Sequence, residues 1–245
     1  MGFVKDFMRN REGGWGWNDA SILAADLEVD EKAASSWLPG WLRMLEPARA
    51  TVFVADYPGT RVGIDPYHET AILLHVRLGK TRAVFCPWML VDDDAAMLQG
   101  REVLGYPKKM GEISLSVGDG RVKASVERKG AKLLDITGDL GGVDPAPPPM
   151  FARNFFNVWG LVGLATQKIL FIKTEEEILE ARKVNAAVTV GGSERDPINE
   201  LGFGEVMEAR LYRLNFARTD SRRLPIPLLP VSPKFMLRHW NLRYL

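Results

Sequence analysis

The chain has 245 residues, of which 46% are hydrophobic and 26% are charged, so it is long enough for one large or two small hydrophobic cores. We expect a single domain over residues 1–245. Its 32 basic and 31 acidic residues leave a net charge of +1, which gives no reason to propose nucleic acid or an anionic membrane as a partner.

Cysteine content and hydropathy indicate the cellular compartment of the protein. A single cysteine, Cys86, excludes an intrachain disulfide framework and fits a reducing compartment, where it would act as a small buried apolar residue. Charged residues interrupt the first 12 positions where a signal peptide would be apolar, and no apolar run approaches the ~20 residues that span a bilayer. We therefore expect a cytoplasmic protein with no membrane partner.

The first third of the chain predicts strands around one short helix. The run Gly13-Gly14-Trp15-Gly16-Trp17 lacks the spacing of a phosphate loop and predicts an irregular arm. Ser21–Val29 alternates like a strand, and Asp30 can cap a short helix that ends before Pro39. Thr51–Ala55 is β-branched and aromatic and predicts another strand.

A hairpin follows. Thr70–Leu78 and Thr81–Leu90 are largely apolar runs joined across Gly79-Lys80. Glu69 stands at the beginning of the first run, so a carboxylate begins a strand that we expect to be buried. His68 is its neighbour, and strand alternation should point His68 away from Glu69.

The next segment predicts a helix that ends just before two lysines. Asp93 or Asp94 can cap it, Gly105 suits a left-handed C-terminal position, and Pro107 prevents the helix from resuming. Three consecutive aspartates at 92–94 lack the rhythm of a metal site and favour capping. Lys108 therefore begins an extended segment in apolar surroundings.

In an extended segment Lys108 and Lys109 should face opposite ways, one inward and one outward. Burial can lower the pKa of a lysine by roughly 3–5 units, which leaves a neutral amine able to attack a ketone and form a Schiff base. The alternative is that Pro-Lys-Lys opens an ordinary solvated strand.

The remainder predicts mainly strands. Ile113–Val117, Arg121–Glu127 and Lys132–Thr137 form an antiparallel meander, and 144–149 is a proline-rich loop. Thr174-Glu175-Glu176-Glu177 resembles a capping box that opens a short helix. Val188–Gly191 and Val206–Phe216 predict further strands. The fold class is thus mainly β (α+β), with antiparallel sheets around an apolar cavity and few short helices.

Other chemistries find little support. His75 and His239 lack paired ligand spacing, and no zinc-type cluster, Gly-x-Ser-x-Gly elbow or Walker-type loop occurs. We expect no metal and no cofactor.

Two motifs together resemble the acetoacetate decarboxylase family: Tyr67-His68-Glu69, and Gly100-Arg101-Glu102 followed by Tyr106-Pro107-Lys108-Lys109. The resemblance is clearest over about residues 50–115 and includes Phe53 and Met89. It implies that Lys108 forms the Schiff base, that Lys109 is its charged neighbour and that Glu69 lines the site. It also implies substrate contacts from Phe53, Met89 and Tyr67.

The resemblance further implies a cone-like double barrel, a homo-oligomer and a small oxo acid as substrate. It would continue as strand where Thr174 begins a possible helix. Activation of the lysine by desolvation or by a neighbouring cation is already known for this family. By geometry, we expect burial to dominate here and the charge of Lys109 to contribute less.

Two positions depart from the family's decarboxylases. Those enzymes usually have a second glutamate in the strand before the Tyr-x-Glu segment and an arginine near the N-terminus, whereas this chain has Val54 and Ala20 there. Arg61, Arg49 or Arg153 would have to replace that arginine. Decarboxylation of an acetoacetate-like 3-oxo acid is the first hypothesis. Aldol and dehydration chemistry on a 2-oxo acid is the second, and a non-enzymatic barrel that binds apolar ligands is the third.

Overall fold

Strands account for most of the chain. The computed structural model describes residues 16–60, 63–160, 167–218 and 226–237, and the statements below refer to these ranges. The strands are β1 (Trp17–Val29), β2 (Arg43–Met44), β3 (Arg49–Tyr57), β4 (Gly59–Thr60), β5 (Tyr67–Leu78), β6 (Thr81–Val91), β7 (Lys108–Met110), β8 (Glu112–Gly118), β9 (Arg121–Arg128), β10 (Ala131–Val143), β11 (Asn154–Trp159), β12 (Lys168–Val190), β13 (Phe203–Arg218) and β14 (Ile226–Pro230). The helices are α2 (Glu31–Ser35), α3 (Asp94–Leu104) and the 3₁₀ turn η2 (Ile198–Leu201).

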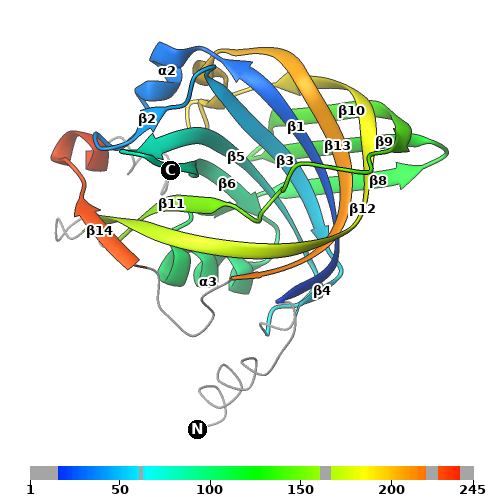
Figure 1. Cartoon of the computed structure of the whole chain (residues 1–245), viewed down its shortest axis with the longest axis horizontal. Helices are drawn as coiled ribbons and strands as arrows, with labels where there is room; N and C mark the ends of the chain where they lie inside the picture. The colour runs from blue at the N-terminus through cyan, green and yellow to red at the C-terminus, as the bar shows by residue number, and fades with distance from the viewer. Residues whose placement is uncertain (1–15, 61–62, 161–166, 219–225, 238–245) are drawn as a thin grey trace, which may run out of the picture.

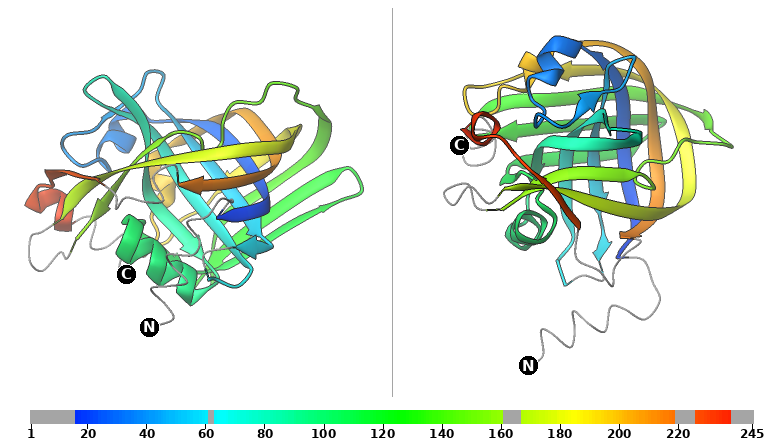
Figure 2. Two further views of the ribbon diagram at one scale, coloured as in Figure 1. Left: turned by 60° about the horizontal axis from the view of Figure 1, so that its bottom comes forward. Right: turned by 60° about the vertical axis from the view of Figure 1, so that its left-hand side comes forward.

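Seven of these strands pair in a closed ring. Hydrogen bonds run in the order β11-β6-β5-β3-β1-β13-β12, and β12 pairs with β11 again. β10, β9 and β8 continue the sheet beyond β12 and lie at the right of Figure 1, and Figure 2 shows the curvature from two other sides. The predicted mainly β fold, with antiparallel sheets curled around an apolar interior, is confirmed. Among the described strands, the only parallel pairings are those of β6 with β7 and with β11.

Alternation along the strands produces two cores. On β3, Phe53 and Tyr57 point into the ring, whereas Val52 and Val54 point outward. The inner core contains Ala20, Ile22, Phe53, Ala55, Tyr57, Tyr67, Ala71, Leu73, Met89, Phe151, Phe155, Ile172, Tyr212 and Leu214. The outer core contains Leu23, Val52, Val54, Ile72, Leu74, Trp88, Leu90, Val122, Ala124, Val126 and Ile136, so the meander β8–β10 covers the outer face of the ring. Cys86 is buried in the inner core, as predicted.

Helix ends form where the sequence predicts them. Asp30 caps α2 by accepting a hydrogen bond of 2.7 Å from the backbone N–H of Ala33, and Asp93 caps α3 through Ala96 at the same distance. Gly105 ends α3 in the left-handed conformation with φ of 68°. The two lysines therefore leave the helix at the predicted position.

The predicted helix at Thr174 is wrong. This segment belongs to β12, where residues 174–177 pair with residues 215–218 of β13. The side chain of Glu176 accepts hydrogen bonds from the backbone N–H groups of Met150 (2.9 Å) and Phe151 (2.5 Å). Sheet pairing thus overrides the local helix signal, and the glutamate caps the proline-rich loop instead of a helix.

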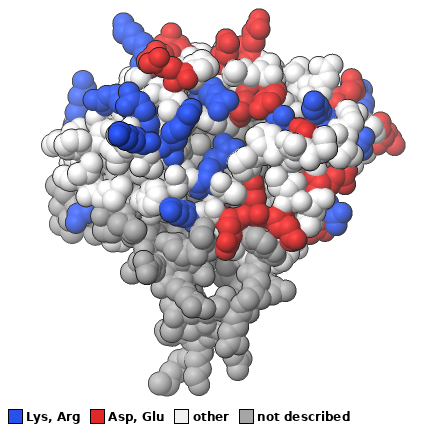
Figure 3. Space-filling model, viewed as in Figure 1, with Lys and Arg blue, Asp and Glu red and all other residues white. Residues whose placement is uncertain are grey.

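Charges of both signs lie on the surface. In the face shown in Figure 3, lysine and arginine gather toward the left and centre, and acidic side chains gather toward the right and the upper edge. Within the described ranges, no helix is both long and apolar enough to cross a membrane.

Candidate active site

Lys108 enters the inner core from the short strand β7. β7 pairs in parallel with the end of β6, which places Lys108 beside Met89 and Lys109 beside Leu90. The Lys108 side chain is only 7% exposed, and its Nζ lies 2.6 Å from Oε2 of Glu69, which is 9% exposed. The structure thus brings together an amine and a carboxylate that are 39 residues apart in the sequence, inside an apolar core.

This ion pair faces a small cavity of about 60 Å³. Most of its wall is aromatic or aliphatic. The lining residues are Trp17, Phe53, Tyr57, Ile64, Tyr67, Glu69, Leu73, Met89, Ala96, Gln99, Gly100, Leu104, Tyr106, Lys108, Phe151, Phe155, Ile172, Thr174 and Phe216. We call this space the lysine cavity.

Two buried tyrosines surround the ion pair. The Tyr57 hydroxyl donates a hydrogen bond of 3.4 Å to Oε1 of Glu69, and the ring of Tyr67 lies 5.4 Å from Nζ of Lys108. Burial and then the negative charge of Glu69 raise the pKa values of both tyrosines well above 10. Both phenols are therefore protonated near neutral pH, and the hydroxyl of Tyr67, which accepts a hydrogen bond from Nε1 of Trp17, keeps its own proton to donate.

Helix α3 provides the other wall, and Gly100 makes room for the lysine. A Cβ at position 100 would lie 2.6 Å from Cδ and Cε of Lys108, closer than side-chain atoms approach. Because Lys108 is also held by Glu69, it has little freedom to move away. Close packing against Lys108 thus explains why the Gly-Arg-Glu motif begins with a glycine in this structure.

Lys109 faces the other way, as alternation predicts. Its Nζ forms an ion pair with Oδ1 of Asp196, which also accepts a hydrogen bond of 2.9 Å from Nε1 of Trp88. Arg128 contacts Oδ2 of the same carboxylate at 2.7 Å. Burial alone would raise the pKa of Asp196, but the bonds from Lys109, Trp88 and Arg128 outweigh burial and lower it. Asp196 is therefore an anion that offsets the charge of Lys109.

Most of the residues predicted from the sequence line the lysine cavity. Glu69, Lys108, Phe53, Met89 and Tyr67 all line the lysine cavity, and Lys109 does not. His68 points away from Glu69, as predicted, and its Nδ1 lies 2.7 Å from Asp92.

The structure also locates the positions at which this chain differs from the family's decarboxylases. Val54 lies in the outer core, so its side chain does not face the lysine cavity, whereas Ala20 lies in the inner core. Arg49 and Arg153 line a different cavity. Arg61 falls outside the described residues, as does His239 of the C-terminal tail.

Sequence reasoning missed several lining residues. Tyr57 could have been found, because it is four positions after Phe53 on one strand and so shares its face. Tyr106 stands within the lysine motif itself. Trp17 and Gln99 enter from β1 and α3, and no spacing linked them to the site. Asp196 lies 87 positions from Lys109, and only the folded chain shows their contact.

The sequence profile of the family described as acetoacetate decarboxylase (ADC) matches residues 7–223. The chain belongs to the acetoacetate decarboxylase family. The members of this family are enzymes.

Individual relatives are distant. Decarboxylase DEC1 of Cochliobolus heterostrophus is 25% identical over 97 residues, which cover 40% of this chain and 38% of that protein. The crystal structure of acetoacetate decarboxylase from Legionella pneumophila superimposes with a TM-score of 0.73 at 15% identity, covering 90% of this chain and 87% of the other. The enduracididine biosynthesis enzyme MppR complexed with pyruvate gives 0.72 at 18% identity, covering 82% and 86%. These two likenesses show the shared fold.

The described residues include no group of three or more histidine, cysteine, aspartate or glutamate side chains that could hold a metal ion.

Proposed function

We propose that this protein is a lyase that forms a Schiff base between Lys108 and a small oxo acid, and that it decarboxylates an acetoacetate-like 3-oxo acid. The observation that carries the proposal is the buried contact between Lys108 and Glu69 at 2.6 Å, facing a small cavity with apolar walls. Two ionisable groups placed in an apolar core cost stability unless they are paired or used, and they mark a functional site.

Glu69 is placed to prepare the amine. Its Oε2 can accept a proton from the Lys108 ammonium group, which leaves a neutral nitrogen with a lone pair. That nitrogen attacks the ketone carbon of the substrate and forms a carbinolamine. Glu69 then returns the proton to the carbinolamine oxygen, water leaves, and a protonated imine remains on Lys108.

The imine accepts the electrons of the breaking bond. When the bond between the neighbouring carbon and the carboxylate breaks, carbon dioxide leaves and the electron pair moves through an enamine to the nitrogen. Protonation of the enamine carbon and addition of water then release the ketone and restore the amine. After Glu69 has taken up a new proton from solvent, it can deliver this proton to the carbon, and the phenol of Tyr57 in contact with Glu69 is the other possible donor.

The walls of the cavity favour this loss of charge. Among its described lining residues the only cation is Lys108, and no arginine is present to hold the substrate carboxylate as an ion pair. The carboxylate would instead meet phenol, indole and amide groups. Decarboxylation converts this poorly solvated anion into a neutral gas and a neutral enamine, which suits such surroundings.

A second reaction has support from the same residues. Ala20, which stands where the family's decarboxylases have an arginine, lies in the inner core, and the fold is shared with an enzyme that has been crystallised with pyruvate. A pyruvate-type Schiff base on Lys108 would lose a proton from its methyl carbon to Glu69, and the enamine would add to an aldehyde. Aldol and dehydration chemistry is therefore the alternative.

Product analysis by ¹³C NMR separates the hypotheses. The protein is incubated with carboxyl-labelled acetoacetate and, separately, with labelled pyruvate plus an aldehyde. We expect labelled carbon dioxide and bicarbonate from acetoacetate, and no turnover by Lys108→Met. A condensation product from pyruvate and the aldehyde, with no carbon dioxide released from acetoacetate, would favour aldol and dehydration chemistry over decarboxylation. Binding of ketones without either product would favour the non-enzymatic barrel.

A further inference from the structure

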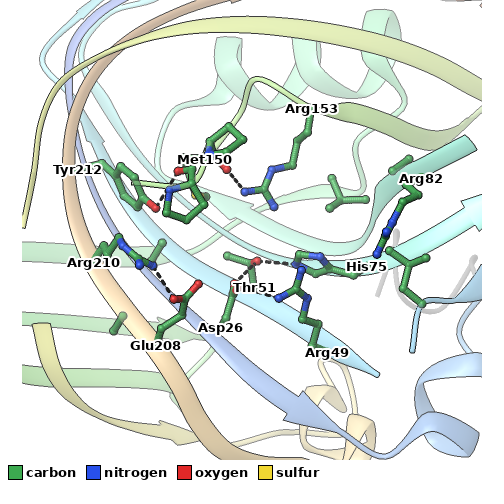
Figure 4. A pocket seen from close by; sticks show the side chains of 17 residues that line it. Asp26, Arg49, Thr51, His75, Arg82, Met150, Arg153, Glu208, Arg210 and Tyr212 are labelled. Atoms are coloured by element: carbon green, nitrogen blue, oxygen red, sulfur yellow. Dashed lines mark hydrogen bonds and ion pairs between the residues drawn. The ribbon is translucent and has the colours of Figure 1, made fainter. Parts of the chain in front are cut away.

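A second, larger cavity lies at the other end of the inner face of the ring. Its volume is about 310 Å³, which is at the lower end of the range of small-molecule sites. Figure 4 shows its polar side chains from close by. The lining residues are Ala24, Asp26, Leu45, Arg49, Thr51, His75, Arg82, Ala83, Val84, Pro148, Pro149, Met150, Arg153, Glu208, Ala209, Arg210 and Tyr212. We call it the arginine cavity.

The two cavities are separate. Thr51 on β3 and His75 on β5 line the arginine cavity, whereas Phe53 and Leu73, two positions along the same strands, line the lysine cavity. Phe151 stands on the lysine side and packs edge-on against Phe53, with ring centroids 5.5 Å apart. These apolar side chains lie between the two spaces, and the cavities have no lining residue in common.

The lining of the arginine cavity carries an excess of positive charge. Four arginines line it against two carboxylates, those of Asp26 and Glu208. Arg210 is neutralised, because it contacts Glu208 at 2.9 Å and Asp144 at 2.7 Å. Asp26 is the one lining carboxylate left for the three remaining arginines, its closest approach to Arg49 is 3.8 Å, and the charge of Glu176 outside the lining also acts on Arg153. Within the described ranges, Arg82 and Arg153 form no ion pair with a carboxylate.

Arg153 is the least satisfied of these groups. One terminal nitrogen donates a hydrogen bond to the backbone carbonyl of Pro149, but its Nε is shielded from solvent and has no hydrogen-bond partner among the described residues. Burial lowers the pKa of Arg153, since desolvation disfavours its charged form. A shielded donor on a cation costs free energy unless an acceptor binds there. An anion in the cavity would supply that acceptor.

His75 marks the point on which the guanidinium groups converge. Figure 4 shows Arg49, Arg82 and Arg153 extending toward the region of this imidazole, which is only 6% exposed. Burial first, and then the charges of these three arginines, lower the pKa of His75 to about 3. Nε2 of His75 lies 2.9 Å from the Thr51 hydroxyl, which donates its own proton to Asp26. The imidazole is therefore neutral and adds a polar edge without a charge.

We propose that the arginine cavity binds a small organic anion. Its carboxylate or phosphate would lie among the guanidinium groups of Arg49, Arg82 and Arg153, which match both anions in geometry. Its carbon part would lie against the apolar wall formed by Leu45, Val84 and Met150. This site is distinct from the lysine cavity and does not depend on the reaction proposed there.

Calorimetric titration at low ionic strength tests this proposal, with inorganic phosphate and succinate as separate probes. We expect at least one probe to bind to the unmodified protein. Arg153→Gln and Arg82→Gln, which each remove a charge, should weaken that binding by about tenfold or more. Arg82 is exposed, so its replacement should not disturb folding. The control is Arg121→Gln, which removes an exposed charge at the beginning of β9, outside the arginine cavity, and should leave the affinity unchanged.

The pattern of results identifies the ligand class or overturns the proposal. Binding of phosphate alone would assign phosphate esters, and binding of succinate alone would assign carboxylates. Absence of binding by both probes at 10 mM, a concentration on the order of the weakest specific affinities, would contradict the site. Loss of binding in Lys108→Met with retention in both arginine variants would place the anion in the lysine cavity. A change in oligomer mass in the arginine variants without a change in anion affinity would show that another copy of the chain fills the cavity.

Discussion

At the scale of single residues, the proposed chemistry depends on the contact between one amine and one carboxylate. The structure holds Nζ of Lys108 and Oε2 of Glu69 at 2.6 Å, with a phenol on the other oxygen of the carboxylate. A proton can pass between these two groups without any movement of the backbone. Lys109, by contrast, is balanced by Asp196 in the outer core, so its charge acts on Lys108 across the sheet and not within the cavity.

Glu69→Gln tests the proton transfer. The amide keeps the size of the side chain but accepts protons poorly, so kcat/KM should fall by about 10²-fold or more while the protein stays folded. Steady-state kinetics and a thermal melt followed by circular dichroism measure both effects. Glu112→Gln, an exposed position at the beginning of β8, serves as the control and should retain full turnover. Unchanged turnover in Glu69→Gln would remove Glu69 from the reaction.

His75 should make the fold sensitive to acid. Its pKa is about 3 in the folded chain and 6.5 when unfolded, so its neutral form stabilises the fold fully above pH 6.5. As the pH falls from 6.5 toward 3, the unfolded state gains the proton first and this stability is lost, by about 3 kcal/mol at pH 4. Urea unfolding between pH 4 and pH 7 measures how steeply the free energy of unfolding changes with pH. His75→Gln should flatten this dependence, and an equal slope in both proteins would contradict the buried neutral imidazole.

At the scale of elements, helix α3 and the strand after it place the lysine. The cap at Asp93, the left-handed Gly105 and the proline at 107 were all readable from the sequence, because local backbone chemistry determines each of them. The hairpin of β5 and β6 was readable for the same reason. The error at Thr174 has the opposite cause: its capping-box pattern is local, but pairing with β13 is a property of the folded sheet. Contacts across the sheet, such as that of Asp196 with Lys109, leave no local pattern at all.

Gly100→Ala tests the packing of α3 on Lys108. Alanine favours a helix by about 1 kcal/mol relative to glycine, so the protein should not lose its fold through α3 itself. The new methyl group would nevertheless push Lys108 away from Glu69, and turnover should fall by about tenfold or more. Gly118→Ala is the matched control, because a Cβ there meets nothing within 4 Å. Equal activity of both variants would mean that Lys108 relaxes around the methyl group without consequence.

At the scale of the whole molecule, Asp196 connects the ring to the meander that covers it. Its carboxylate contacts Trp88 on β6, Lys109 on β7 and Arg128 on β9. Asp196 is far from all three residues in the sequence, and its carboxylate holds the three strands together. The same contacts fix β7, so the position of Lys108 depends on a group on the opposite face of the sheet.

Asp196→Asn should therefore destabilise the protein strongly. The substitution removes the negative charge that the buried cations Lys109 and Arg128 share, which costs about 3–5 kcal/mol. Because the folded pKa of Asp196 lies below its ordinary 3.8, this stabilisation is present above pH 3.8 and is lost as the pH falls through the folded value. Chemical denaturation should show a difference in the free energy of unfolding between the unmodified protein and Asp196→Asn. This difference should be constant near neutral pH and become smaller below about pH 4. Asp139→Asn, at an exposed ion pair, should cost less than about 1 kcal/mol. Similar losses for the two variants would contradict the linking role.

The central claim is that Lys108 forms the imine, and reductive trapping tests it most directly. The protein is treated with sodium borohydride in the presence of acetoacetate, and in parallel with pyruvate, and its peptides are analysed by mass spectrometry. We predict that at least one of these ketones leaves a reduced, covalent adduct on the peptide containing Lys108, at Lys108 itself, and that Lys108→Met leaves none. An adduct on Lys109, or no adduct with either ketone, would contradict the account.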